Sequence, residues 1–238
     1  MKRPTTIFFM LLVSLASAFF AAHAVALNGL AESSAEYCRT ATRQAPQEVR
    51  ERTGVSLRDL EVLDDEEYRK AAGLERSVVL GVAGDWTDIE SHVLERGPAS
   101  ASATKTLASV VFSGRAELVE KLIELGVPPA AGAAEEVPLI NASLCGYNDI
   151  AKILLRSGAN PNATTIQGQD AMLQAVVQDN QALGRLLMDH GYDPCVMALD
   201  DGRNLNDMID HMDENNDDHP AFWQDFKCRK GGLARLVQ

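Results

Sequence analysis

The chain has 238 residues, of which 22 are basic and 34 acidic, so its formal net charge at pH 7 is −12. Phosphate contacts are made by Lys and Arg, so a chain this acidic is a poor nucleic-acid binder and suits a basic protein partner better. Its length and its 46% of hydrophobic residues are enough to bury an ample core.

The first 24 residues are organised like a secretory signal peptide. Lys2 and Arg3 precede an apolar run over 7–22, and the run ends in A-H-A at 22–24, with A-V-A at 24–26 as a second possible cleavage site. The alternative is a membrane anchor, but a run of about 16 residues is short for a transmembrane helix. We therefore expect cleavage and export to the periplasm or out of the cell, with no stable membrane anchor left.

Residues 25–76 are predicted to form short helices, punctuated by Pro46 and by Gly54. Because the end of a repeat stack exposes an apolar face, we interpret this segment as a helical N-terminal extension that covers the first repeat. A catalytic site within the extension is a remote alternative. Activity of the isolated chain on lipid or peptidoglycan would favour it.

From residue 77 onward, two markers recur at one interval. Gly126, Gly158 and Gly191 each follow an apolar helical run, at intervals of 32 and 33 residues. The same intervals separate three apolar residues that we expect to open the first helix of each unit, Leu107, Leu139 and Met172. A fixed period near 33 residues predicts stacked helical units.

Residues 137–163 read V-P-L-I-N-A-S-L-C-G-Y-N-D-I-A-K-I-L-L-R-S-G-A-N-P-N-A. This resembles the ankyrin repeat, whose pattern runs T-P-L-H-x-A-A-x-x-G, then I-V-x-x-L-L, then G-A-D-x-N-A. The resemblance implies an all-α, ankyrin-type solenoid of helix-turn-helix repeats with a helical extension and a C-terminal cap. The alternative is an unrelated bundle of helical hairpins. The implied units are 77–99, 104–130, 137–163 and 168–196, with a cap at 200–228 and a tail at 229–238.

Four cysteines remain after cleavage, and an even number in an exported chain indicates disulfides with three possible pairings. Cys195 follows the second helix of one unit, and Cys228 ends the second helix expected in the cap. Equivalent ends of adjacent units are neighbours in a solenoid, so we expect this pair to form. Cys38 with Cys145 then follows by elimination only, and buried or free thiols are the alternative.

No local pattern indicates a catalytic or metal site. His92, His190, His211 and His219 lack the HExxH or CxxC companions of a metal site, and we expect them to be surface residues. The acidic run 213–218 lacks the central Gly and terminal Glu of a calcium loop. We therefore expect no enzyme and no bound cofactor or metal.

Ankyrin-like modules usually bind through the loop tips and first helices of their units. The resemblance places partner-binding residues at Thr104, Phe112, Ser113, Glu136, Leu144, Cys145, Ile166, Gln167, Gln169, Val177 and Gln178. Phe112, Leu144 and Val177 occupy one place in three successive units, where the family is commonly polar. We name these three residues the helix-end strip and expect it to be an exposed apolar hot spot. In the alternatives, the extension folds over the strip or its residues pack between units.

Together, the resemblance and the signal peptide predict an exported protein that binds another protein. One hypothesis is that the chain is an immunity protein that neutralises a delivered toxin, such as a phospholipase or wall hydrolase. An acidic face would speed its encounter with a basic toxin. A second hypothesis is that it is a general periplasmic scaffold that supports an enzyme, for example in oxidative-stress defence.

Overall fold

The computed structural model describes residue 38 and residues 76–129, 137–196, 198–199, 201–215 and 221–229. The predicted signal peptide, the extension apart from Cys38 and Arg76, Glu136 and the tail after residue 229 lie outside these residues, so those predictions stay predictions. Within the described residues every regular element is a helix, and extended chain pairs only as isolated bridges.

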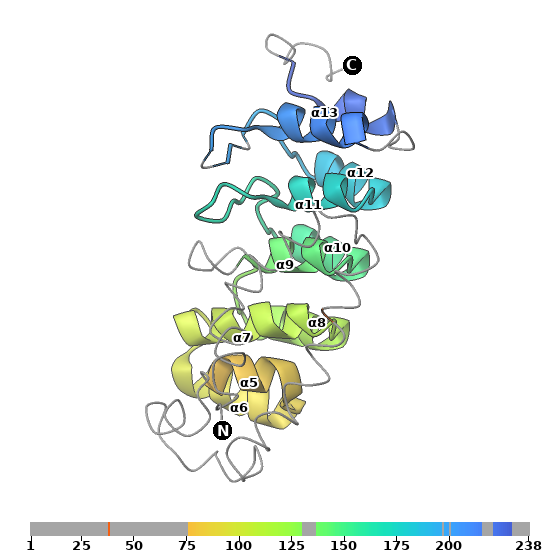
Figure 1. The fold of residues 1–238 in the computed structure, drawn as a ribbon. Helices are drawn as coiled ribbons and strands as arrows, with labels where there is room; N and C mark the ends of the chain where they lie inside the picture. Colours follow the sequence, from red (N-terminus) through yellow and green to blue (C-terminus); the bar gives the residue numbers. More distant parts are fainter. Residues whose placement is uncertain are drawn as a thin grey trace, which may run out of the picture.

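The described helices form four antiparallel pairs and a C-terminal cap, which is an all-α, ankyrin-type solenoid as predicted (Figure 1). The pairs are α5 (Arg76–Ala83) with α6 (Trp86–Arg96), α7 (Ala101–Phe112) with α8 (Ala116–Glu124), α9 (Pro138–Leu144) with α10 (Asn148–Arg156), and α11 (Ala171–Val177) with α12 (Gln181–Asp189). The cap consists of α13 (Leu205–Asn215) and a 3-10 helix, η2 (Ala221–Phe226).

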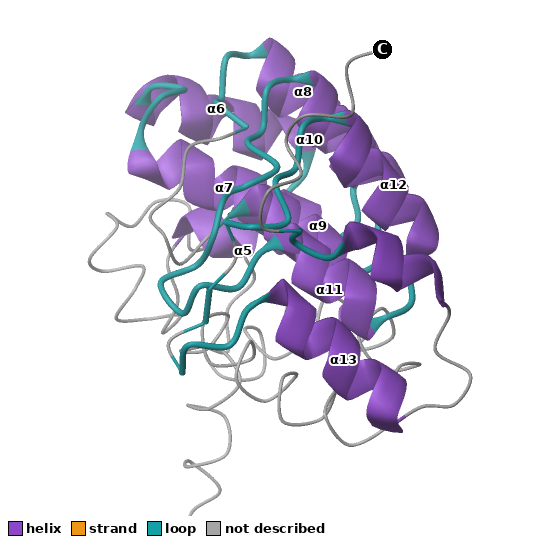
Figure 2. Cartoon of the chain, turned by 90° about the horizontal axis from the view of Figure 1, so that it is seen from above, coloured by secondary structure: helices purple, strands orange, loops and turns teal. Residues whose placement is uncertain are grey.

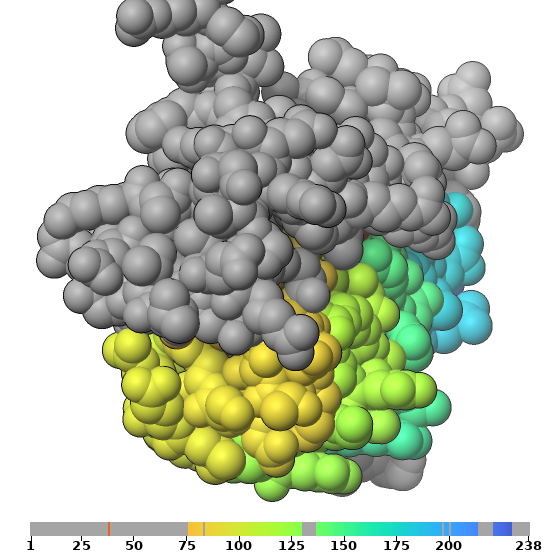
Figure 3. All heavy atoms as spheres, turned by 90° about the horizontal axis from the view of Figure 1, so that it is seen from below, coloured from red at the N-terminus to blue at the C-terminus, as the bar shows by residue number. Residues whose placement is uncertain are grey.

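The helices stack in two rows. The first helices of successive units contact one another from α5 through α7, α9 and α11 to α13, and the second helices do so from α8 through α10 to α12. Viewed along the stack, the second helices lie on one side of the first helices and the long loops on the other (Figure 2). At the far end, the surface of α5 and α6 lies next to that of the second unit (Figure 3).

Helix α10 shows why the repeat folds this way. Ile150 and Leu154 are spaced four residues apart and are fully buried, whereas Lys152 and Arg156 on the opposite face are exposed. Gly158 follows with a φ of 95°, which a glycine adopts without the steric cost of a Cβ. The same pattern closes the neighbouring units, so one apolar core runs from α6 to η2.

The second unit departs from the predicted boundaries. Helix α7 has 12 residues where α9 and α11 have 7 each, so Leu107 lies inside the helix instead of opening it. The reason is local, because the side chain of Ser100 accepts a hydrogen bond from the backbone N–H of Ala103 (3.1 Å) and caps the helix a turn and a half earlier. The longer helix packs closely against α5.

The cap is held by side chains that reach back to the preceding unit. Trp223 is fully buried, and its indole N–H donates to the carboxylate of Asp179 (2.9 Å). Its ring packs directly on Gly184 of α12. A Cβ at that position would lie only 2.8 Å from the nearest ring atom, so the absence of a side chain at Gly184 makes room for the indole. Phe222 and Phe226 pack around the same ring.

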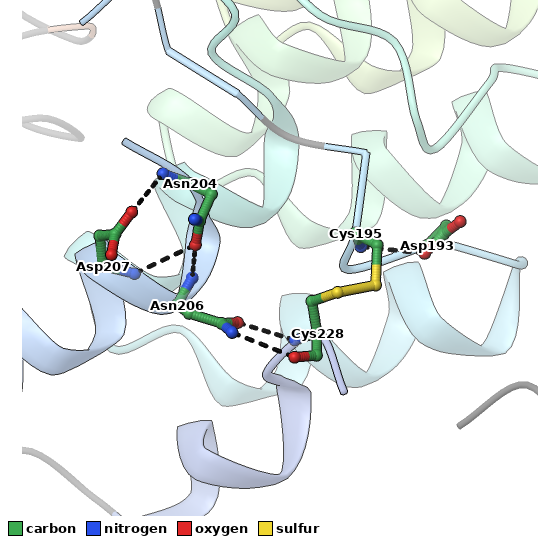
Figure 4. The surroundings of a disulfide bond; sticks show 6 residues. All are labelled: Asp193, Cys195, Asn204, Asn206, Asp207 and Cys228. Carbon is green, nitrogen blue, oxygen red and sulfur yellow. Dashed lines mark hydrogen bonds between the residues drawn. A yellow bond between two sulfur atoms is a disulfide. The ribbon is translucent and has the colours of Figure 1, made fainter. Parts of the chain in front are cut away.

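Both expected cysteine pairs are at bonding distance. Cys195 and Cys228 form a disulfide with a Cα–Cα separation of 4.8 Å, and the side chain of Asn206 exchanges two hydrogen bonds with the backbone of Cys228 (Figure 4). Cys38 and Cys145 form the second disulfide, with a Cα–Cα separation of 5.8 Å. The two bonds together use all four cysteines of the chain.

Candidate partner-binding surface

The helix-end strip is aligned as predicted but is not exposed. Phe112, Leu144 and Val177 are the last residues of α7, α9 and α11, so the period places them at equivalent positions. The exposed fractions of Phe112 and Leu144 are only 6% and 9%, and Val177 is half-buried against the core. The prediction of an exposed apolar strip is therefore wrong.

Two different contacts bury the strip. Phe112 forms a small apolar cluster with Cys38 and Cys145, which are bonded to each other, and Tyr147 packs on the same cluster. At the next unit, the side-chain amide of Gln178 donates to the backbone carbonyls of Ser143 (3.0 Å) and Leu144 (3.2 Å). Cys38 belongs to the N-terminal extension and Gln178 to the next unit, so the two contacts correspond to the two alternatives to an exposed strip.

Most of the other predicted contact residues also serve the fold. Thr104 is buried inside α7, where its hydroxyl donates to the carbonyl of Ser100 (3.1 Å). Ser113 ends the same helix, and its hydroxyl donates to the carbonyl of Val110 (2.7 Å). Cys145 is fully buried in its disulfide, and Gln169 is only 7% exposed. Thr104, Cys145 and Gln169 are therefore buried and Ser113 is half-buried, their predicted contact with a partner stays a prediction, and Glu136 lies outside the described residues.

Ile166 and Gln167 are the predicted contact residues that do lie at a projecting tip. They belong to a short hairpin over 164–170, here named the first finger. The backbone N–H of Thr165 donates to the carbonyl of Gln169 (2.8 Å), and that of Gly168 donates to the carbonyl of Thr165 (3.0 Å). These two bonds close the turn and hold the tip out from the stack.

The same hairpin recurs 34 residues later in the cap. In this second finger, over 198–204, the N–H of Leu199 donates to the carbonyl of Arg203 (2.8 Å), and that of Gly202 donates to the carbonyl of Leu199 (2.9 Å). Both fingers project on the same side of the stack (Figure 1). This turn lies at the start of the cap predicted for 200–228.

The two fingers touch at their backbones. Gly168 has a φ of 77°, and a Cβ there would lie 1.8 Å from the carbonyl oxygen of Ala198. No side chain fits in that space, so only glycine allows the second finger to approach the first so closely. The fingers therefore form one continuous surface rather than two separate loops.

A buried pair that the sequence reasoning missed anchors the base of the first finger. One carboxylate oxygen of Asp170 accepts a bond from the N–H of Leu173 (2.8 Å) and caps α11, and the other accepts the hydroxyl of Tyr192 (2.6 Å). Both side chains are buried. The available signal was positional, because Asp170 stands where the repeat pattern has its helix-opening Thr.

Burial governs the charge of this pair. It raises the pKa of Asp170 from 3.8 to about 6, against the hydrogen bonds from Tyr192 and the helix start, which lower it. Burial also raises the pKa of Tyr192, with the neighbouring Asp170 charge adding to the effect. At pH 7 the Asp170 carboxylate is therefore still largely ionised, and its buried charge lowers the free energy of unfolding.

Exposed side chains of two kinds surround the fingers. Ile166 on the first finger is 56% exposed, and Val196, just before the second finger, is 47% exposed. On the second finger, Asp201 and Arg203 form a surface ion pair (2.7 Å). The pKa of Asp201 is lowered, chiefly by the hydrogen bond from the backbone N–H of Arg203. We name Ile166, Gln167, Val196, Asp201 and Arg203 the finger surface.

One histidine differs from its expected surface position. His92 is only 4% exposed, and its Nε2 lies 2.8 Å from the hydroxyl oxygen of Ser102.

In the part of the chain that the structure describes, no group of His, Cys, Asp and Glu is placed to hold a metal ion. Nor does any helix there combine the length and apolarity that crossing a membrane requires.

Comparisons with known proteins agree with this architecture. Residues 136–166 match the ankyrin repeat family model. Over 96 residues, 40% of this chain, the sequence is 35% identical to a protein of Treponema pallidum (strain Nichols) named as ankyrin repeat-containing. That match covers 32% of the relative, so the chain spans about a third of its length. These matches support the ankyrin-repeat family, whose members generally bind other proteins and are typically non-enzymatic.

Proposed function

We propose that this chain is an exported protein-binding module that contacts its partner through the finger surface. The observation that carries the proposal is the exposure of Ile166 at the tip of the first finger and of Val196 just before the second finger, next to turns closed by backbone hydrogen bonds. Solubility alone favours polar residues at such positions, and exposed apolar side chains rimmed by polar ones are typical of protein contact sites. The buried helix-end strip leaves the fingers as the better candidate.

The cysteines support the exported location. All four are placed in two disulfides, and disulfides persist in oxidising compartments such as the periplasm. This agrees with the signal peptide predicted for residues 1–24. The mature chain therefore works in the periplasm or outside the cell.

For the partner we propose a basic protein, because the chain carries a net charge of −12. Opposite charge raises the rate of encounter and lowers the chance of binding to acidic competitors. An immunity role fits best, in which the module binds and neutralises a delivered toxin such as a phospholipase or wall hydrolase. In the second candidate role, the module is a scaffold that supports a periplasmic enzyme.

The test has two steps, capture and titration. Purified mature chain is immobilised, partners are captured from a periplasmic extract, and the captured protein is then produced separately. Increasing amounts of the module are added to the partner in its own activity assay. Immunity predicts stoichiometric inhibition, whereas a scaffold predicts unchanged or raised activity.

Two results would contradict the proposal. One is a captured set that does not change when the finger surface is altered by Ile166→Asp. The other is turnover of lipid or peptidoglycan by the isolated chain, which would favour an enzyme with a site in residues 25–76. Cell fractionation with N-terminal sequencing tests export directly, since a retained Met1 in the membrane fraction would contradict signal cleavage.

A further inference from the structure

The two disulfides differ sharply in their access to solvent. Cys38 and Cys145 are both 0% exposed and share a buried apolar cluster with Phe112. Cys195 is exposed and Cys228 is half-buried, at the edge of the cap. Exchange of a disulfide requires a thiolate to reach one of its sulfurs, so access divides the two bonds into a protected one and an open one.

We propose that Cys195–Cys228 is a site of thiol–disulfide exchange, whose co-substrate is the dithiol of an exported oxidoreductase. The attacking thiolate of the dithiol reaches Cys195, the exposed partner, and forms a mixed disulfide while Cys228 leaves as a thiolate and takes up a proton. The second thiol of the dithiol then attacks its own mixed-disulfide sulfur and releases Cys195. The net reaction converts the protein disulfide to two thiols and the dithiol to a disulfide.

Breaking this bond by exchange weakens the attachment of the cap to the preceding unit. The bond closes a loop of 33 residues that includes α13 and η2. When the bond is broken, the cap keeps the packing of Trp223 and Phe226, the hydrogen bond from Trp223 to Asp179 and the two hydrogen bonds between Asn206 and Cys228, but no covalent tie to the preceding unit. The reduced cap therefore opens more often, because the unfolded loop regains the freedom that the bond removed.

Opening uncovers a site on α12. Trp223 fills the space above Gly184, and Arg185 lies over the ring of Phe222 (4.9 Å). When η2 lifts, this apolar seat and the carboxylate of Asp179 become accessible. Exchange at Cys195–Cys228 therefore couples the redox state of the compartment to the exposure of the last repeat, while Cys38–Cys145 keeps the rest of the stack intact.

The inference rests on the proposed export, since cytosolic thiols would keep all four cysteines reduced. Its test uses the purified, fully oxidised chain, so its failure is separable from failure of the partner-binding proposal. The chain is treated with dithiothreitol as the probe dithiol, samples are alkylated at intervals, and the peptides are quantified by mass spectrometry. The same chain in denaturant gives the unprotected rate for each bond.

We expect Cys195 and Cys228 to be alkylated at least tenfold faster than Cys38 and Cys145 in the folded chain. Their rate should lie within tenfold of the rate in denaturant, and the mixed disulfide should form on Cys195. Equal rates for the two bonds, or faster reduction of Cys38–Cys145, would overturn the proposal.

A second measurement tests the cap. In a Trp86→Phe variant, Trp223 is the remaining tryptophan of the chain, so its fluorescence reports on η2 alone. We expect iodide quenching to increase after selective reduction and to return after reoxidation. Quenching that stays at its oxidised level would overturn the coupling between exchange and cap opening.

Discussion

The helix-end strip and the finger surface repeat with nearly the same period but reach opposite environments. Phe112 and Leu144 end successive helices and are buried, whereas Ile166 lies on a finger and is 56% exposed. Phe112 packs in a cluster with Cys38, which lies before the repeats, and with Cys145, the cysteine 107 positions away to which Cys38 is bonded. A repeat period thus aligns residues in space, but contacts with neighbouring units and with residues outside the repeats decide whether an aligned residue is exposed.

The largest expected effect tests the buried side of this comparison. Phe112→Ala should lower the free energy of unfolding by about 3–5 kcal/mol, because truncation of a buried Phe leaves a cavity. Ile166→Ala is the matched control and should change it by less than about 0.5 kcal/mol, as surface substitutions usually do. Urea unfolding of both variants checks this. Equal stability of the two would mean that Phe112 is not part of a packed cluster.

The next effect tests whether the fingers form one surface. Gly168→Ala should cost about 2–4 kcal/mol, because the residue has a positive φ and its Cβ would clash with the carbonyl of Ala198. Gly202→Ala shares the positive φ (85°) but meets no neighbour within 4 Å, so it should cost only about 1–2 kcal/mol. If urea unfolding gives the same loss for both, the close contact between fingers is wrong.

A smaller, pH-dependent effect comes from the base of the first finger. The pKa of Asp170 is about 6 in the folded state, against an ordinary value of 3.8, so the folded state takes up a proton at a higher pH than the unfolded state does. The contribution of this group to the free energy of unfolding therefore increases as the pH falls from about 7 to about 4, by up to about 3 kcal/mol. Above pH 7 both states are ionised and the contribution is constant.

Asp170→Asn separates this contribution from that of the other carboxylates. Asn still caps a helix and still accepts the hydroxyl of Tyr192, so the fold is preserved. The difference in unfolding free energy between the wild type and this variant should grow in favour of the wild type as the pH falls from 7.5 to 4. Parallel pH curves for the two proteins would contradict a raised pKa at Asp170.

The repeat fold was predictable because its signals are local. Gly126, Gly158 and Gly191 follow apolar helices at a fixed interval, and each adopts the positive φ that the motif requires. The Cys195–Cys228 pair followed from the same geometry, since equivalent ends of adjacent units are neighbours. Features that are determined within one repeat can therefore be predicted from the sequence of that repeat.

The surface was less predictable because exposure depends on distant residues. Nothing near Phe112 indicates that Cys38 lies against it. The early start of α7 depends on Ser100, which lies before the repeat pattern begins and therefore carried no family signal. Asp170 and Tyr192 are 22 residues apart and form a pair only once the finger base folds.

Binding of a partner at the finger surface can be tested on single variants. Two variants test it most directly, Ile166→Asp on the first finger and Leu94→Asp on α6, where Leu94 is equally exposed at 58%. Thermal melting should be nearly unchanged in both. We expect Ile166→Asp to weaken binding of the captured partner at least tenfold in calorimetric titration, which is about 1.4 kcal/mol, while Leu94→Asp retains wild-type affinity. Unchanged affinity in Ile166→Asp, or an equal loss in Leu94→Asp, would contradict the account.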